Sequence, residues 1–133
     1  MNRLDLINKD QALHWCISRQ NEGFHGRVNK PDDTCYSYWI GSALDILGHA
    51  DLIDTKTMET FLDKTISKYG GYGKHPDAYP DVMHSYMGLA GLAIVDSHGL
   101  QPLYSPLGCS RRIQEFLISL HANQFGQNGN KEL

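Results

Sequence analysis

The sequence predicts an all-α fold in which one helical unit occurs twice and is followed by a further helix. Five segments carry apolar residues at helical spacing, and glycine, proline and aspartate separate them. No segment shows the apolar–polar alternation of a strand. The two halves also match without a gap at an offset of 48 residues, so that Gly23 falls on Gly71 and Asp33 on Asp81. A fixed period of this size is typical of stacked supersecondary units.

The first unit consists of a helix, a loop and a more apolar helix. The first helix is expected from about Lys9-Asp10 to Gln20, with a broad apolar face (Leu13, Trp15, Cys16 and Ile17). Residues 21–32 form a loop interrupted by glycines and a proline. The second helix is expected from about Asp33 to Leu47, with Gly48 as its C-terminal cap. It is apolar on most sides, so we expect it to be buried nearly all round.

The second unit repeats this order. Asp54 is the expected N-cap of a helix over residues 55–68, whose inward residues are Met58, Phe61, Leu62 and Ile66. Residues 69–80 form a second loop, and an apolar helix follows at 81–95. Pro102 and Pro106 mark an irregular crossing before a final helix at 110–121, whose apolar residues are Ile113, Phe116, Leu117 and Leu120. The polar residues 127–132 suggest a frayed tail.

Composition excludes several classes of function. At 133 residues the chain fits one domain, and its formal net charge of −3 gives no basic surface for nucleic acid or an anionic membrane. Its three cysteines are odd in number and widely spaced, which suits a reducing compartment. No apolar run reaches the length of a membrane span, and the N-terminus shows no signal-peptide pattern. We expect a soluble, cytoplasmic protein.

Asp33, Cys35 and His84 are candidate ligands of a zinc ion. Asp33 lies at the expected helix start, and the positive end of the helix is expected to lower the pKa of Cys35. The offset of 48 places His84 in the equivalent first turn of the next apolar helix. Three protein ligands and an open fourth position are typical of catalytic zinc. Taken singly, the same residues are also explained as a helix cap, a core cysteine and an isolated histidine.

Three cations gather where the two apolar helices should begin. Arg27 and Lys30 lie on the first loop, and Lys74 lies on the second. Helix N-termini attract anions, so these cations suggest a phosphate or diphosphate, although exposed loop cations are often merely solvated. The residues beside them could be ordinary core or could wall a cavity for a long apolar ligand (Tyr38, Trp39, Tyr86 and Met87).

Residues 26–39, 70–72 and 80–86 together resemble the β subunit of protein prenyltransferases. The resemblance extends from about Asp10 to Val95, and more weakly to the final helix. It implies an α/α toroid, a catalytic zinc ion, an α-subunit partner, and transfer of an isoprenoid from its diphosphate to a cysteine near a protein's C-terminus.

The resemblance also implies residue roles. Asp33, Cys35 and His84 match the family's zinc ligands. The expected diphosphate- and isoprenoid-binding residues are Arg27, Lys30, Tyr36, Trp39 and Lys74, and Lys74 and Tyr36 are the expected catalytic pair. Met87 departs from the aromatic residue that the family usually has there.

Thr34 and Lys74 make the chain most similar to the type I geranylgeranyltransferase β subunit, because farnesyltransferases usually have glycine and aspartate at these places. This implies geranylgeranyl diphosphate as donor, CaaX-motif proteins such as small GTPases as acceptors, and no requirement for magnesium. The β subunits of Rab geranylgeranyltransferase and farnesyltransferase remain alternatives.

The family's toroid has more helices than the five expected here. We therefore expect residues 1–122 to be the C-terminal part of a prenyltransferase toroid and residues 123–133 to be a polar tail. A stacked repeat without its neighbours exposes apolar surface, so we expect the isolated chain to be inactive and prone to aggregate. A catalytically inactive, truncated zinc-binding helical module is the non-enzymatic alternative. A distant terpene cyclase relative would not explain Asp33, Cys35 and His84.

Overall fold

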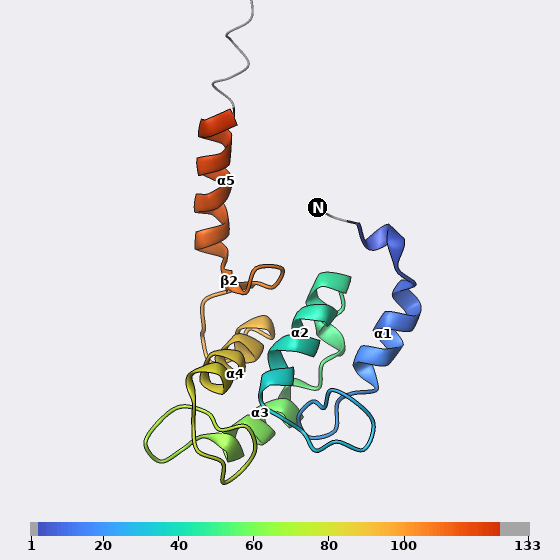
Figure 1. The fold of residues 1–133 in the computed structure, drawn as a ribbon, viewed down its shortest axis with the longest axis vertical. Coiled ribbons are helices and arrows are strands. Elements are labelled where there is room, and N and C mark those ends of the chain that lie inside the picture. The colour runs from blue at the N-terminus through green and yellow to red at the C-terminus, as the bar shows by residue number, and fades with distance from the viewer. Residues whose placement is uncertain (1–2, 126–133) are drawn as a thin grey trace, which may run out of the picture.

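The computed structural model describes residues 3–125, and within them the fold is all-α (Figure 1). Its helices and short 3-10 turns are η1 (Leu4–Leu6), α1 (Lys9–Ile17), α2 (Cys35–Leu47), η2 (Ala50–Leu52), α3 (Thr55–Thr65), α4 (Val82–Ile94) and α5 (Arg111–Phe125). The five predicted helices are confirmed. The final helix, predicted to end at residue 121, continues to Phe125, so residues 123–125 of the predicted tail are helical. The rest of the predicted tail, from position 126 onward, lies outside the described residues.

Most helix boundaries follow local capping chemistry. The Asp54 side chain accepts a hydrogen bond from the Thr57 backbone N–H at 3.0 Å, as the N-cap prediction requires. Gly48 ends α2 with a φ of 83°, a left-handed conformation that glycine adopts without a steric penalty. Helices α1 and α3 are each three residues shorter than predicted, because Ser18 and Ile66 already leave the helical conformation.

The core forms where α2 packs against α4, and buried residues of α1 and α3 complete it. Gly91 of α4 allows this close approach, because a Cβ atom there would lie 2.6 Å from the Cβ of Ser37 on α2. The buried apolar cluster draws on both helical units (Cys16, Phe24, Ile40, Leu44, Ile53, Met58, Phe61, Leu62, Tyr72 and Leu92). The apolar faces predicted for α1 and α3 supply part of this cluster, but Trp15, Ile17 and Ile66 are exposed.

The prediction that α2 is buried nearly all round is wrong, and α4 shares the exposed face. Trp39 is 52% exposed and Tyr86 is 44% exposed, and Leu89 lies one turn beyond Tyr86 on the same side of α4. Helix α2 packs against α1, η2 and α4, but within residues 3–125 these elements leave the Trp39 side chain half exposed. An apolar face therefore remains open beside the α2–α4 pair.

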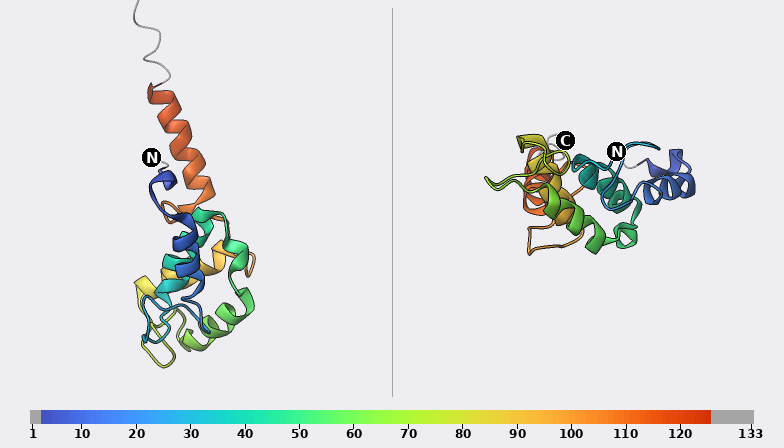
Figure 2. Two further views of the ribbon diagram at one scale, coloured as in Figure 1. Left: turned by 90° about the vertical axis from the view of Figure 1, so that its right-hand side faces the viewer. Right: turned by 90° about the horizontal axis from the view of Figure 1, so that it is seen from below.

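After α4 the chain forms a small structure that the sequence did not predict. Strands β1 (Leu103–Tyr104) and β2 (Cys109–Ser110) pair antiparallel, with Leu103 opposite Ser110. Two residues a strand are too few to give an alternating pattern, so the expectation of no strand is wrong here. Helix α5 then extends away from the other helices (Figures 1 and 2), and its apolar residues are exposed.

No helix among residues 3–125 has both the length and the apolar character that crossing a membrane requires.

Candidate metal centre

Two loops bring the N-terminal ends of α2 and α4 together. The loop before α2 and the loop before α4 both lie at the lower end of the molecule in Figure 1. The Thr34 backbone N–H donates to the Lys74 carbonyl oxygen at 2.9 Å, which joins the two loops directly. The Asp33 N–H donates to the Phe24 carbonyl oxygen at 3.0 Å and fixes the end of the first loop. The starts of the two apolar helices thus lie side by side, and we call this edge of the molecule the rim.

Asp33, Cys35 and His84 converge at this rim. One ligand atom from each lies within 4.8 Å of the others, and no other such group of three occurs among the described histidine, cysteine and acidic residues. His84 Nε2 lies 3.3 Å from Asp33 Oδ1, and both side chains are largely buried. The proximity that the 48-residue offset predicted is therefore present. The oxygen, sulfur and nitrogen donors suit a zinc ion, which accepts all three.

Asp81 orients His84, a role that the sequence analysis missed. Its Oδ1 accepts the His84 backbone N–H at 2.9 Å, and its Oδ2 lies 2.6 Å from His84 Nδ1. These hydrogen bonds hold the pKa of Asp81 below its usual value. With Nδ1 occupied, Nε2 faces the cluster, as in metal sites where a carboxylate supports the ligating histidine. A capping aspartate three residues before a candidate histidine ligand is the signal that could have revealed it.

The expectation that the helix start lowers the pKa of Cys35 is wrong, because the groups of the protein around it raise that pKa. Burial, followed by the hydrogen bond and negative charge of Asp33, raises the pKa of the Cys35 thiol to about 12. The Lys74 ammonium lowers it by a smaller amount. Desolvation of the thiolate thus outweighs the field of the helix start. The surroundings of Cys35 thus disfavour the thiolate at neutral pH, and a metal cation bound there would supply positive charge that favours it.

Of the three predicted cations, Lys74 lies beside the cluster, whereas Arg27 and Lys30 lie exposed on the first loop. Lys74 Nζ lies 3.6 Å from Asp33 Oδ2, with more than half of its side chain exposed. Arg27 and Lys30 are exposed on the first loop, where the Lys30 N–H donates to the Arg27 carbonyl oxygen. The Tyr36 ring packs so closely on Gly26 that a Cβ there would lie 2.1 Å from the phenol oxygen. Tyr36 therefore stands beside the loop that carries Arg27.

The aromatic side chains line the open face beside the cluster. Tyr38 and Tyr86 meet edge to face with ring centroids 6.0 Å apart, and Trp39 lies 5.2 Å from Tyr38. The Tyr38 and Tyr86 hydroxyls donate to carbonyl oxygens of the turn between β1 and β2. Met87 is buried in the core, so it does not join the exposed aromatic surface.

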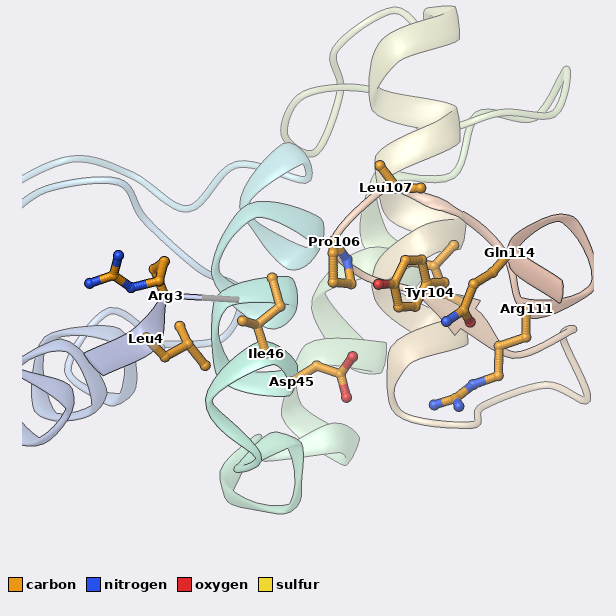
Figure 3. A pocket seen from close by; sticks show the side chains of 10 residues that line it. Arg3, Leu4, Asp45, Ile46, Tyr104, Pro106, Leu107, Arg111 and Gln114 are labelled. Carbon is orange, nitrogen blue, oxygen red and sulfur yellow. The ribbon is translucent and has the colours of Figure 1, made fainter. Parts of the chain in front are cut away.

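A cavity of about 950 Å³ lies elsewhere, toward the C-terminal end of α2 (Figure 3). Asp45 and Ile46 of α2 line it, with Leu4 of η1, Tyr104 of β1 and Arg111 of α5 around them. A helix rises 1.5 Å per residue, so Asp45 lies about 15 Å along α2 from Cys35. The residues predicted to wall an apolar cavity do not line this one.

Residues 1–118 match a known family, the prenyltransferase alpha-alpha toroid domain. The chain is 44% identical over 105 residues to the geranylgeranyl transferase type-1 subunit beta of Arabidopsis thaliana, covering 77% of this chain and 28% of that protein. It is 38% identical over 115 residues to the subunit of the same name from Dictyostelium discoideum, covering 84% of this chain and 33% of that protein. The chain thus spans about a third or less of the length of these relatives.

A solved structure shares the fold. The Candida albicans protein geranylgeranyltransferase-I, complexed with GGPP, superposes with a TM-score of 0.74 at 32% sequence identity. The match covers 78% of this chain and 35% of that one.

Proposed function

The chain belongs to the prenyltransferase alpha-alpha toroid family, and from this premise we propose that it forms part of the β subunit of a zinc-dependent protein geranylgeranyltransferase of type I. In this reaction the sulfur of a CaaX cysteine forms a bond to the first isoprenoid carbon of geranylgeranyl diphosphate, and diphosphate leaves. The observation that carries the proposal is the buried Asp33–Cys35–His84 cluster with the Lys74 ammonium beside it.

Asp33, Cys35 and His84 would hold the zinc ion, and Asp81 would keep His84 Nε2 turned toward it. Bound zinc lowers the pKa of a coordinated thiol, which supplies the nucleophile at neutral pH. The burial of His84 and Cys35 restricts water at the cluster, and this strengthens every electrostatic contact there.

Lys74, Arg27, Lys30 and Tyr36 would hold the diphosphate and stabilise the charge that develops as its C–O bond breaks. Lysine and arginine form charge-assisted hydrogen bonds to phosphate oxygens, and a fixed ammonium can replace a divalent cation in this role. The position of Lys74 within 3.6 Å of Asp33 supports this assignment, because it places the ammonium at the edge of the metal cluster. We therefore propose that magnesium is not required.

The open face of α2 and α4 would form one wall of the isoprenoid site. Trp39 and Tyr86 present apolar rings there, and long prenyl chains need such a surface. Further toroid repeats and the α subunit would complete the enclosure. The three unpaired cysteines support a reducing compartment, which we take to be the cytoplasm. We also propose that residues 1–122 belong to the toroid and residues 123–133, which begin within the last turn of α5, to a tail.

Metal content tests the proposed centre. We expect about one zinc ion per chain by elemental analysis, and its loss in Cys35→Ser and His84→Ala, because each removes one of three ligands. Cys109→Ser is the matched control, since this cysteine lies outside the cluster and should leave the zinc content unchanged. Folded wild-type chain without zinc would contradict the proposed centre.

Prenyl transfer tests the activity. With an α subunit supplied, geranylgeranyl diphosphate should label a CaaX peptide, and farnesyl diphosphate should label it much more slowly. Preferential farnesylation would favour the farnesyltransferase alternative, and labelling of Rab proteins alone would favour the Rab enzyme. Zinc without any labelling would favour a non-catalytic zinc module.

A further inference from the structure

Thr34 occupies the N-cap position of α2 but does not cap the helix. An N-cap threonine usually accepts a backbone N–H of the first helical turn with its hydroxyl oxygen. The Thr34 side chain makes no such bond, and Asp33 Oδ1 accepts the Cys35 N–H instead, at 3.0 Å. Thr34 is nevertheless fully buried, with 0% of its surface exposed. Its hydroxyl therefore serves another contact.

That contact is with the loop of the second helical unit. The Thr34 hydroxyl donates to the Gly73 carbonyl oxygen at 2.7 Å, and the Thr34 N–H donates to the Lys74 carbonyl oxygen at 2.9 Å. The hydroxyl of Thr65 lies 3.2 Å from that of Thr34, and the Thr65 carbonyl oxygen accepts the Gly73 N–H. Two successive carbonyl groups of the second loop are thus fixed to the start of α2.

These bonds hold the main chain from which the Lys74 side chain extends. The lysine side chain is flexible, and that of Lys74 is more than half exposed, so packing alone does not fix its ammonium group. The backbone of residues 73–74 is the part that the fold can hold in place. Its anchor, Thr34, is the chain neighbour of Asp33, whose carboxylate lies beside the ammonium.

We propose that Thr34 is a positioning residue, which fixes the Lys74 main chain so that the ammonium faces a diphosphate bound beside the metal centre. The proposal rests on the proposed function, because that function assigns the diphosphate to Lys74. The equivalent residue of the second unit, Val82, has no hydroxyl and is 87% exposed. The buried hydroxyl contact is therefore found in the first helical unit and has no equivalent in the second.

A double-mutant cycle tests this role in the chain assembled with its α subunit. Inorganic diphosphate is the probe, and its affinity is measured by calorimetry for Thr34→Val in the Lys74 and Lys74→Ala backgrounds. Because contacting residues couple, we expect Thr34→Val to weaken binding about five- to tenfold when Lys74 is present and less than about twofold when it is absent. Thr34→Ser keeps the hydroxyl and should restore most of the affinity.

Thr60→Val is the matched control, because it removes an exposed hydroxyl that donates to the Lys56 carbonyl oxygen on α3. It should not change diphosphate affinity. Zinc content and melting temperature are measured for every variant, and Thr34→Cys replaces any Thr34→Val chain that does not fold.

Equal losses in both Lys74 backgrounds, or failure of Thr34→Ser to restore binding, would overturn the proposal and leave the proposed function standing. Absence of diphosphate binding by the wild-type assembly would overturn the proposed function, and this inference with it.

Discussion

A single carboxylate, that of Asp81, has two roles at the start of α4. One oxygen caps the helix through the His84 backbone, and the other holds His84 Nδ1. The same residue thus begins the helix and aims a candidate metal ligand. Capping affects stability, whereas aiming the ring affects the metal, so substitutions can separate the two roles.

Asp81→Ala should weaken zinc binding roughly 10- to 100-fold, because the His84 ring loses the carboxylate that orients it. A competing chelator titrated against the chain measures this affinity. Asp54→Ala is the matched control, since it removes a similar cap from α3, where no histidine depends on it. A zinc affinity unchanged by Asp81→Ala would show that the carboxylate only caps the helix.

Lys74→Asp should make prenyl transfer depend on magnesium. The substitution replaces an ammonium by a carboxylate beside Asp33, and a diphosphate near two carboxylates needs a hard divalent cation to bind well. Labelling rates of the assembled enzyme with and without magnesium measure the dependence. His75→Asp places the same charge on the neighbouring exposed residue and should leave the enzyme independent of magnesium. Turnover of Lys74→Asp without magnesium would count against the role of Lys74.

For single residues, the sequence predicts which side chains lie close together better than it predicts how deeply each one is buried. The proximity of Asp33, Cys35 and His84 follows from two helix starts and one repeat offset, all of which are readable in the chain. The raised pKa of Cys35 depends on burial by other elements, which no local pattern records. The hydrogen bond of the Thr34 hydroxyl was not predicted for the same reason, because the Gly73 carbonyl that accepts it lies 39 residues away.

Among the elements, the contact between α2 and α4 places the candidate ligands. Asp33 and Cys35 stand at the start of one helix and His84 stands in the first turn of the other, so the helix separation sets the ligand separation. Gly91 permits that separation through its approach to Ser37. Interhelical packing and metal binding are therefore linked.

Gly91→Ala should destabilise the fold by about 1–3 kcal/mol, because the added Cβ would lie within 3 Å of the Ser37 backbone and must push the helices apart. It should also lower zinc affinity, since His84 moves with α4. Denaturant titration and chelator competition measure the two effects. Gly41→Ala on α2 is the matched control: its Cβ meets only ordinary contacts at 3.5 Å or more, and alanine favours the helix. Equal behaviour of both variants would contradict the packing argument.

The elements that the sequence placed least well are those with the fewest local constraints. The helix starts at Asp54 and Asp81 agree with prediction, because a side-chain cap is a local signal. The β1–β2 pair is too short to show a period, and the direction of α5 depends on tertiary contacts. Periodicity predicted the apolar face of α5, but it could not predict that this face would be exposed within the described residues.

Across the described structure as a whole, many large apolar side chains are exposed to solvent. The open side of α2 and α4 exposes aromatic rings, and α5 exposes most of its apolar residues while standing away from the other helices (Figure 2). Repeat units bury their faces against neighbouring units, so a surface of this kind supports the proposal that the chain packs against further toroid repeats or a partner subunit. The match to about a third of the length of the relatives agrees with this view.

The isolated 133-residue chain should therefore self-associate and show no prenyl transfer. The driving force is burial of apolar side chains on α5, which contributes roughly 25 cal/mol for each Å² removed from water. Sedimentation velocity over a range of concentrations measures the association, and Phe116→Glu with Ile118→Glu should reduce it, because both side chains are more than half exposed. Tyr79→Glu, on an exposed loop residue, is the control and should leave association unchanged. A monomer at all concentrations that transfers geranylgeranyl groups unaided would show that the described helices form a complete enzyme.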